Sequence, residues 1–135
     1  MTHIASYWIQ SSDFSHQDYP AADAQEITRA LEAHDWAAEH ERRRSLVDAG
    51  KEECPAGLGV MAADERRLII RLDENLCCVV EYSFFDKGKA FGILPKRTYH
   101  CGELENVPLE VAASFVGPFL ANDYAAVKTE IESRA

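Results

Sequence analysis

The sequence lacks the features that mark several classes of protein. It contains no run of 18 apolar residues, which excludes a membrane-spanning helix. The opening residues, MTHIASYWIQ, have no basic segment followed by a long apolar stretch, so no secretory signal is expected. The chain also has no glycine-rich phosphate-binding loop, no GxSxG motif and no CxxC pair. We therefore expect a cytoplasmic protein that needs no cofactor.

Basic residues are scarce. The 135-residue chain has 14 Lys and Arg against 23 Asp and Glu, for a net charge of −9. Residues 1–53 hold 11 acidic and 5 basic residues, residues 54–102 hold 6 and 7, and residues 103–135 hold 6 and 2. Nucleic acid is not expected as a ligand, because phosphate binding needs clustered Lys and Arg. The acidic flanks could steer a basic protein partner, or serve solubility alone.

Length and hydrophobic patterning predict one α+β domain spanning residues 1–135. The alternation of HIASYWIQ favours a first strand at 3–10, followed by a polar loop at 11–20. Asp23 and Glu26 have capping-box spacing, which predicts a helix over 23–35, and helical composition continues to Gly50.

After residue 57 the period changes from helical to two. The sequence predicts an antiparallel β-meander of about four to five strands, packed with N-terminal and C-terminal helices. Pro118 should end or kink the first C-terminal helix, because proline lacks the N–H that a helix interior needs. The predicted elements are strands 58–62, 67–72, 76–85 and 90–94, a hairpin connection at 86–89, an irregular loop at 95–108 with room for a short strand near 98–101, a helix over 107–120, and a last helix capped by Asn122 or Asp123.

The adjacent thiols Cys77 and Cys78 look at first like a chemical site. In a strand, however, neighbouring side chains point to opposite faces, so the pair cannot bind one metal. Leu76, Cys78 and Val80 share the stronger core face, so we expect Cys78 to be buried and Cys77 to be half-buried. Without ligand pairs at chelating spacing no metal site is predicted, and the four cysteines are expected to be free thiols.

Two charged helical segments are predicted to be neither a zinc site nor a phosphate site. HDWAAEHE (34–41) lacks the HExxH spacing of a zinc helix and is interpreted as a solvated helix face. The three arginines of ERRRS (41–45) fan around a helix, and we expect them to pair with Glu39 and Glu41, or with other acidic residues of the chain, instead of binding phosphate.

The predicted loop 95–108 offers the best candidates for binding. Loops on rigid scaffolds often carry binding residues, and Tyr and Arg are favoured interface anchors. An ordinary surface connection is the alternative. The candidate binding residues are Arg97, Tyr99, His100, Glu103 and Glu105.

The segments LIIRLDENLCCVVEYSFFDKGKAFGIL and VPLEVAASFVGPFL, separated by this loop, together resemble small immunity proteins of bacterial polymorphic toxin systems. The resemblance covers residues 58–120 and lies in the layout of a meander, a loop and a helix that begins near a proline and ends in Phe-Leu. It implies a non-enzymatic inhibitor that occludes the active site of a cognate toxin, which would be a basic protein partner.

Two other functions remain open from the residues. A homo-oligomer would use the outer sheet face around Val79 and Phe85 as its interface. A small enzyme or ligand-binding domain would use Tyr99, His100 and Cys101, with a low-pKa thiol beside a base.

Overall fold

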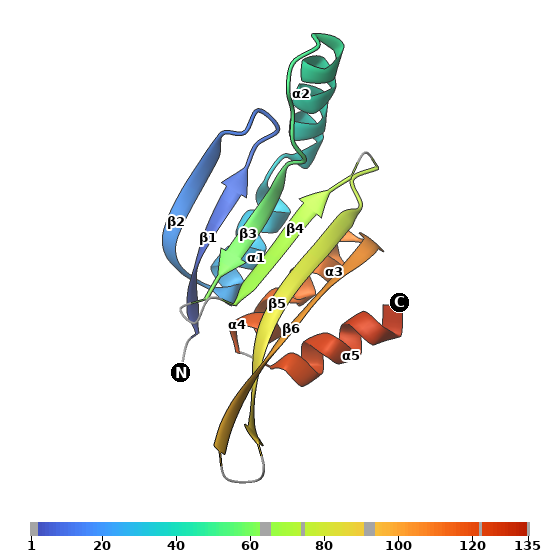
Figure 1. The fold of residues 1–135 in the computed structure, drawn as a ribbon. Helices are drawn as coiled ribbons and strands as arrows, with labels where there is room; N and C mark the ends of the chain where they lie inside the picture. The colour runs from blue at the N-terminus through green and yellow to red at the C-terminus, as the bar shows by residue number, and fades with distance from the viewer. Residues whose placement is uncertain (1–2, 63–65, 74, 91–93, 122, 135) are drawn as a thin grey trace.

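The structure is a computed structural model. It describes residues 3–62, 66–73, 75–90, 94–121 and 123–134, of which 84–90, 94–99, 124, 131 and 134 are described by their backbone alone. Its centre is a six-stranded antiparallel sheet in the order β2-β1-β3-β4-β5-β6 (Figure 1). The predicted α+β class is confirmed, but the expected four to five strands were too few. The strands are β1 (Ile4–Gln10), β2 (His16–Asp23), β3 (Gly57–Met61), β4 (Arg67–Leu72), β5 (Cys78–Ala90) and β6 (Leu94–Val107).

The prediction of a polar loop at 11–20 was wrong, because β2 begins at His16. As an edge strand, β2 pairs only with β1 and faces solvent over most of its length, so its polar sequence HQDYPAAD is compatible with a strand. Tyr19 of this strand stacks on Tyr7 with ring centroids 4.5 Å apart, and Ala22 is buried in the core.

The predicted hairpin connection at 86–89 and the predicted loop at 95–108 were also wrong. Both segments belong to the long β5–β6 pair, which runs in register from Ala90 opposite Leu94 to Cys78 opposite Val107. Residues 91–93, part of the predicted strand 90–94, lie outside the described residues. The polar sequence of β6 is explained by its edge position, and one register shift occurs near Asn106, whose φ is 59°.

The described helices are α1 (Ala24–Ala33), α2 (Trp36–Asp48), α3 (Leu109–Ser114), α4 (Val116–Leu120) and α5 (Tyr124–Arg134). The caps follow the predictions, since Asp23 accepts a hydrogen bond from the Glu26 N–H at 2.8 Å and Asp123 accepts one from the Ala126 N–H at 3.1 Å. The single helix expected over 107–120 is divided at Phe115. Pro118 explains the division, because it cannot donate to the carbonyl four residues earlier.

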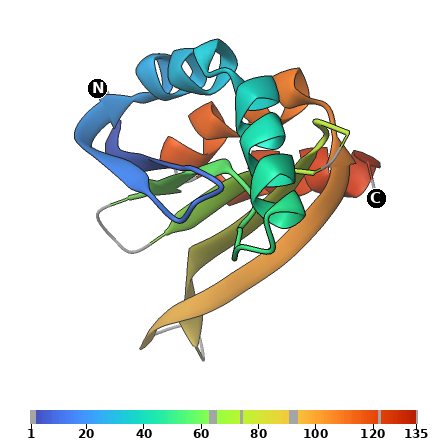
Figure 2. The ribbon, with the colours of Figure 1, turned by 90° about the horizontal axis from the view of Figure 1, so that it is seen from above.

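Helices α1, α3, α4 and α5 lie on one face of the sheet, and α2 crosses its upper end (Figures 1 and 2). Cys78 is fully buried in this core and Cys77 is half-buried, as predicted. Leu76 was expected in the core but is 38% exposed, because it lies in the β4–β5 turn with a φ of 59°. None of the described helices is long and apolar enough to cross a membrane. Apolar side chains that are at most 1% exposed form the centre of the core: Leu58, Val60, Leu68, Ile70, Cys78 and Val80 from the sheet, and Ile27, Leu31, Ala112, Phe115, Val116, Phe119 and Val127 from the helices.

Candidate functional site

The face of the sheet opposite the helices carries a second set of side chains, which we call the open face. No described helix covers it (Figure 2). Its side chains alternate with those of the core and are mostly half-buried. The residues of the open face are Ser6, Trp8, Gln10, Gly57, Gly59, Met61, Arg67, Ile69, Arg71, Val79, Glu81, Ser83, Cys101 and Glu103.

Strand register arranges these residues in straight rows across the sheet. The central row places Trp8 opposite Gly59, Gly59 opposite Ile69, Ile69 opposite Glu81, and Glu81 opposite Glu103. The row therefore changes from aromatic and aliphatic on β1 and β4 to acidic on β5 and β6. Because each strand is hydrogen-bonded to its neighbours, the surface is held rigidly.

Trp8 lies flat on the sheet because its cross-strand neighbour is glycine. A Cβ atom on Gly59 would lie 2.6 Å from Trp8 Cη2 and still closer to Cε2 and Cζ2 of the same indole ring. Glycine is poorly suited to a strand interior, and an aromatic ring on the neighbouring strand can cover the exposed backbone. The Trp8–Gly59 pair therefore gives the open face a broad apolar surface without a protruding side chain.

Arg71 is the centre of the charged part of the open face. Its guanidinium donates to Glu81, and its Nη2 lies 4.0 Å from Oε2 of Glu103. Since Glu81 and Glu103 are directly opposite each other, their carboxylates would repel without a cation between them. These side chains are about one third exposed or more, so solvent screening leaves each pair a small contribution to stability.

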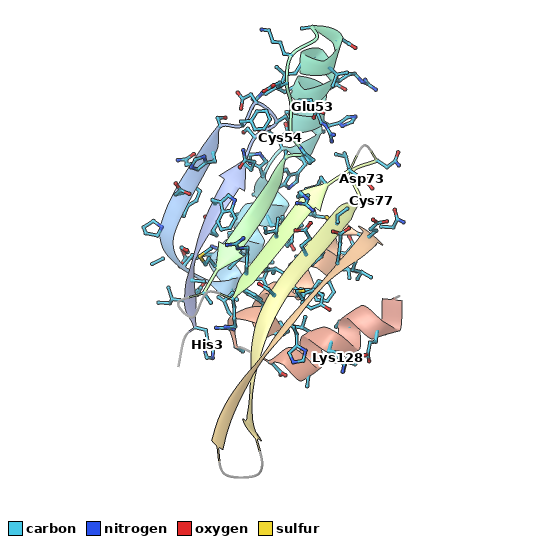
Figure 3. The ribbon with its side chains drawn as sticks, viewed as in Figure 1. His3, Glu53, Cys54, Asp73, Cys77 and Lys128 are labelled. Carbon is cyan, nitrogen blue, oxygen red and sulfur yellow. The ribbon has the colours of Figure 1, made fainter. Side chains whose placement is uncertain are left out.

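Three shallow hollows are lined partly by residues of the open face. One of about 360 Å³ lies between Arg67, Ile69 and Cys101, and one of about 310 Å³ lies between Trp8, Phe14 and Cys54. A third, of about 420 Å³, reaches from Arg71 and Glu103 to Arg43 and Asp73 at the upper end of the sheet. Figure 3 shows Glu53 and Cys54 beside α2 at this end, with Asp73 and Cys77 at the nearby β4–β5 turn.

The candidate binding residues predicted from the sequence lie on one strand and not on a loop. Glu103 belongs to the open face. Glu105 is exposed and lies two residues further along β6. His100 is half-buried and alternates to the helix-covered side of β6. Arg97 and Tyr99 are opposite Lys87 and Phe85 in the backbone register, and their side chains lie outside the described part of the chain.

The interpretation of residues 34–41 as a solvated helix face was wrong for Glu39, which is buried. Glu39 is only 5% exposed, and its carboxylate accepts hydrogen bonds from Ser11 Oγ at 3.1 Å and from the Ser12 N–H at 3.4 Å. His34 Nε2 and Arg42 Nη1 each lie 3.3 Å from the same carboxylate. The sequence could not indicate this network, because Ser11 and Ser12 are 27 or 28 residues from Glu39 and meet it only in the fold.

The predicted pairing of the arginine cluster is confirmed. Arg42 pairs with Glu39 and Arg44 pairs with Glu41, at 3.3 Å and 3.4 Å respectively. Arg43 also pairs with Glu53 on the segment that leads into β3. These contacts engage the cluster with carboxylates of its own chain, as the acidic composition led us to expect.

The open face carries a thiol on β6. Cys101 is exposed on it, whereas His100 alternates to the other side of the strand and His34 is engaged with Glu39 and packs on Trp36, with ring centroids 4.3 Å apart. Burial raises the pKa of the Cys78 thiol to about 12, so this sulfur stays protonated at neutral pH. Within the described ranges, no three His, Cys, Asp or Glu residues gather in a way that could hold a metal ion.

Comparison with known proteins adds no relative. The chain matches no family model, no curated protein and no solved structure. The resemblance to immunity proteins therefore stays a prediction from the sequence.

Proposed function

We propose that this protein is a non-enzymatic binding protein that docks another folded protein on its open face. The class of partner follows from the sequence resemblance: the catalytic domain of a cognate toxin, whose active site the bound protein would occlude. The observation that carries the proposal is a rigid, uncovered sheet face on which Trp8, Ile69 and Arg71 form adjoining apolar and charged areas.

The residue types on the open face are those favoured in protein–protein contacts. Trp and Arg are enriched among residues that dominate binding energy, and Met is enriched at interfaces generally. Trp8 and Ile69 are already half-buried and held by the sheet, so little conformational entropy would be lost when a partner covers them. A preorganised surface of this kind supports tight binding without a deep cavity.

Net charge supports a basic partner. The chain carries −9 overall, although residues 84–100 alone hold four basic residues against one acidic residue. The rest of the molecule is therefore more acidic than the total indicates, and its field would accelerate encounter with a basic protein. Long-range steering of this kind weakens as salt rises, because the Debye length falls from about 10 Å at 0.1 M to about 3 Å at 1 M.

Affinity capture with the tagged protein from its native cells, at low and at high salt, tests this proposal. We expect one stoichiometric partner with an enzymatic domain, faster association at low salt, and loss of the partner's activity when the two proteins are mixed. Recovery of the protein alone from cells that express the candidate toxin would contradict the proposal, as would a partner whose activity is unchanged by binding.

A further inference from the structure

The two edges of the sheet differ in how they are protected from further pairing. On β2, Pro20 removes a backbone donor, and the strand is only eight residues long. At the opposite edge, β6 is 14 residues long and pairs with β5 on one side only. Its single proline, Pro95, lies at the second residue of the strand, so no proline interrupts the backbone between Lys96 and the register shift near Asn106.

Half of this edge belongs to a projecting arm. The pairing of β4 with β5 ends where Arg67 is opposite Ser83, so residues 84–90 and 94–100 form a two-stranded ribbon beyond the sheet (Figure 1). A ribbon of two strands alone is marginally stable in water, and further strands stabilise it. The arm therefore has a physical reason to pair with an additional strand.

The charges along β6 change sign at its middle. Lys96 and Arg97 lie before His100, whereas Glu103 and Glu105 lie after it. If two copies of β6 run antiparallel about a twofold axis at His100, Arg97 of one copy is opposite Glu103 of the other. Residues directly opposite in an antiparallel pair share a face, so the Arg97–Glu103 pairing occurs twice, once at each end of the contact. In the same register Lys96 is opposite Leu104 and Glu105 is opposite Pro95.

We propose that β6 is a self-complementary dimerisation edge, at which a second copy of this chain pairs antiparallel about His100. The arm of each copy then lies against the body segment 101–106 of the other, and the two six-stranded sheets become one continuous sheet. The added strand lies in the plane of the sheet and leaves the open face uncovered. The inference is therefore independent of the proposed function.

Charge reversal tests the pairing by sedimentation velocity over a dilution series. The wild-type protein is expected to be a dimer, while Arg97→Glu alone and Glu103→Arg alone each place like charges opposite each other at both symmetry-related contacts. Each single variant should associate roughly tenfold or more weakly. An equimolar mixture of the two variants should form a heterodimer, because both contacts then join unlike charges.

Matched controls carry the same charge changes on α2. Arg44→Glu and Glu41→Arg alter a solvent-exposed pair within α2 that is not part of the β6 edge, and they should leave dimerisation unchanged. A monomeric wild-type protein, a dimer that neither β6 variant weakens, or a mixture that stays monomeric would each overturn the proposal. Circular dichroism of each variant shows that it is folded before its assembly state is interpreted.

The exposed thiol of Cys101 gives a second measurement that needs no charge change. About a twofold axis at His100, the two Cys101 residues are diagonal neighbours, with Cα atoms about 7–8 Å apart. This separation is too long for an unstrained disulfide but short enough for a bismaleimide with a short spacer. The wild-type protein should give a cross-linked dimer that Cys101→Ser abolishes, and a cross-link that is absent or insensitive to Cys101→Ser contradicts the pairing.

Discussion

The Trp8–Gly59 contact allows a quantitative test of how the open face is built. In Gly59→Ala, the added methyl group would lie 2.6 Å from Trp8 Cη2 and nearer to two other ring atoms. Either the indole must leave the sheet or the two strands must separate. Overpacking of this kind costs about 1–3 kcal/mol.

The same substitution should have the opposite sign when the ring is absent. In a Trp8→Ala background the methyl group meets no indole, and alanine in a strand interior is favoured over glycine by about 0.5–1 kcal/mol. The coupling free energy between the two positions is then about 1.5–4 kcal/mol. Gly117 provides the control, since a Cβ there has no atom within 4 Å and Gly117→Ala should have the same small effect in both backgrounds.

Urea unfolding of the four variants of this cycle measures the coupling. Far-UV circular dichroism reports the sheet and helices, and Trp36, which is 5% exposed and present in every variant, reports the core by fluorescence. If Gly59→Ala changes the free energy of unfolding equally with and without Trp8, the indole does not depend on Gly59 and the description of the open face is refuted.

The remaining predictions concern the core and the thiols. Arg66→Ala should destabilise the protein by about 2–3 kcal/mol in urea unfolding, because the guanidinium donates to the Phe119 carbonyl and lies 5.5 Å from its ring centroid; loss of less than 0.5 kcal/mol would contradict this. Glu39→Ala should cost about 2–3 kcal/mol by the same assay, because it leaves the buried Ser12 N–H and its neighbours without an acceptor; a neutral effect would refute the role of the network. Because burial raises the Cys78 pKa from 9.0 to about 12, the unfolded thiol ionises first as pH rises, and stability should fall by up to about 1.4 kcal/mol per unit between pH 9 and 12. Cys78→Val should reduce that slope, and an unchanged slope would contradict the assignment. At neutral pH, iodoacetamide followed by mass spectrometry should label exposed Cys101 and leave Cys78 unlabelled.

Periodicity and capping residues were enough to predict the class of fold. Strands 3–10 and 67–72 follow the alternation of apolar residues, and α1 and α5 begin after aspartates that accept the expected hydrogen bonds. These signals are local, because a strand face or a helix cap depends on residues within a few positions of one another.

The two edge strands were missed for a physical reason. A strand with a neighbour on one side only, and with solvent around much of it, can carry charged residues where a central strand needs apolar ones. HQDYPAAD in β2 and PKRTYHCGELENV in β6 therefore have the composition of loops. Pairing with β1 and β5 makes them strands, and composition alone does not indicate that pairing.

The open face could be predicted only in fragments. Alternation correctly groups Ser6, Trp8 and Gln10 on one side of the first strand. The row that joins Trp8 to Gly59 and Ile69 depends on the register between strands about 50 residues apart, and a shift of one residue would exchange the two faces. Nothing local in the sequence sets that register, so the site emerges only from the assembled sheet.

A comparison of Ile69→Lys with Val47→Lys in binding to a captured partner tests whether the open face is the docking surface. Ile69 is half-buried at the centre of the open face, whereas Val47 is 56% exposed on α2 and is not one of the strand residues that form that face. Isothermal titration should show that Ile69→Lys weakens binding at least about 100-fold, as expected for a charge introduced at an interface centre, while Val47→Lys binds as the wild type does. Equal affinities for the wild type and Ile69→Lys would contradict docking on the open face, because the partner would then contact another surface.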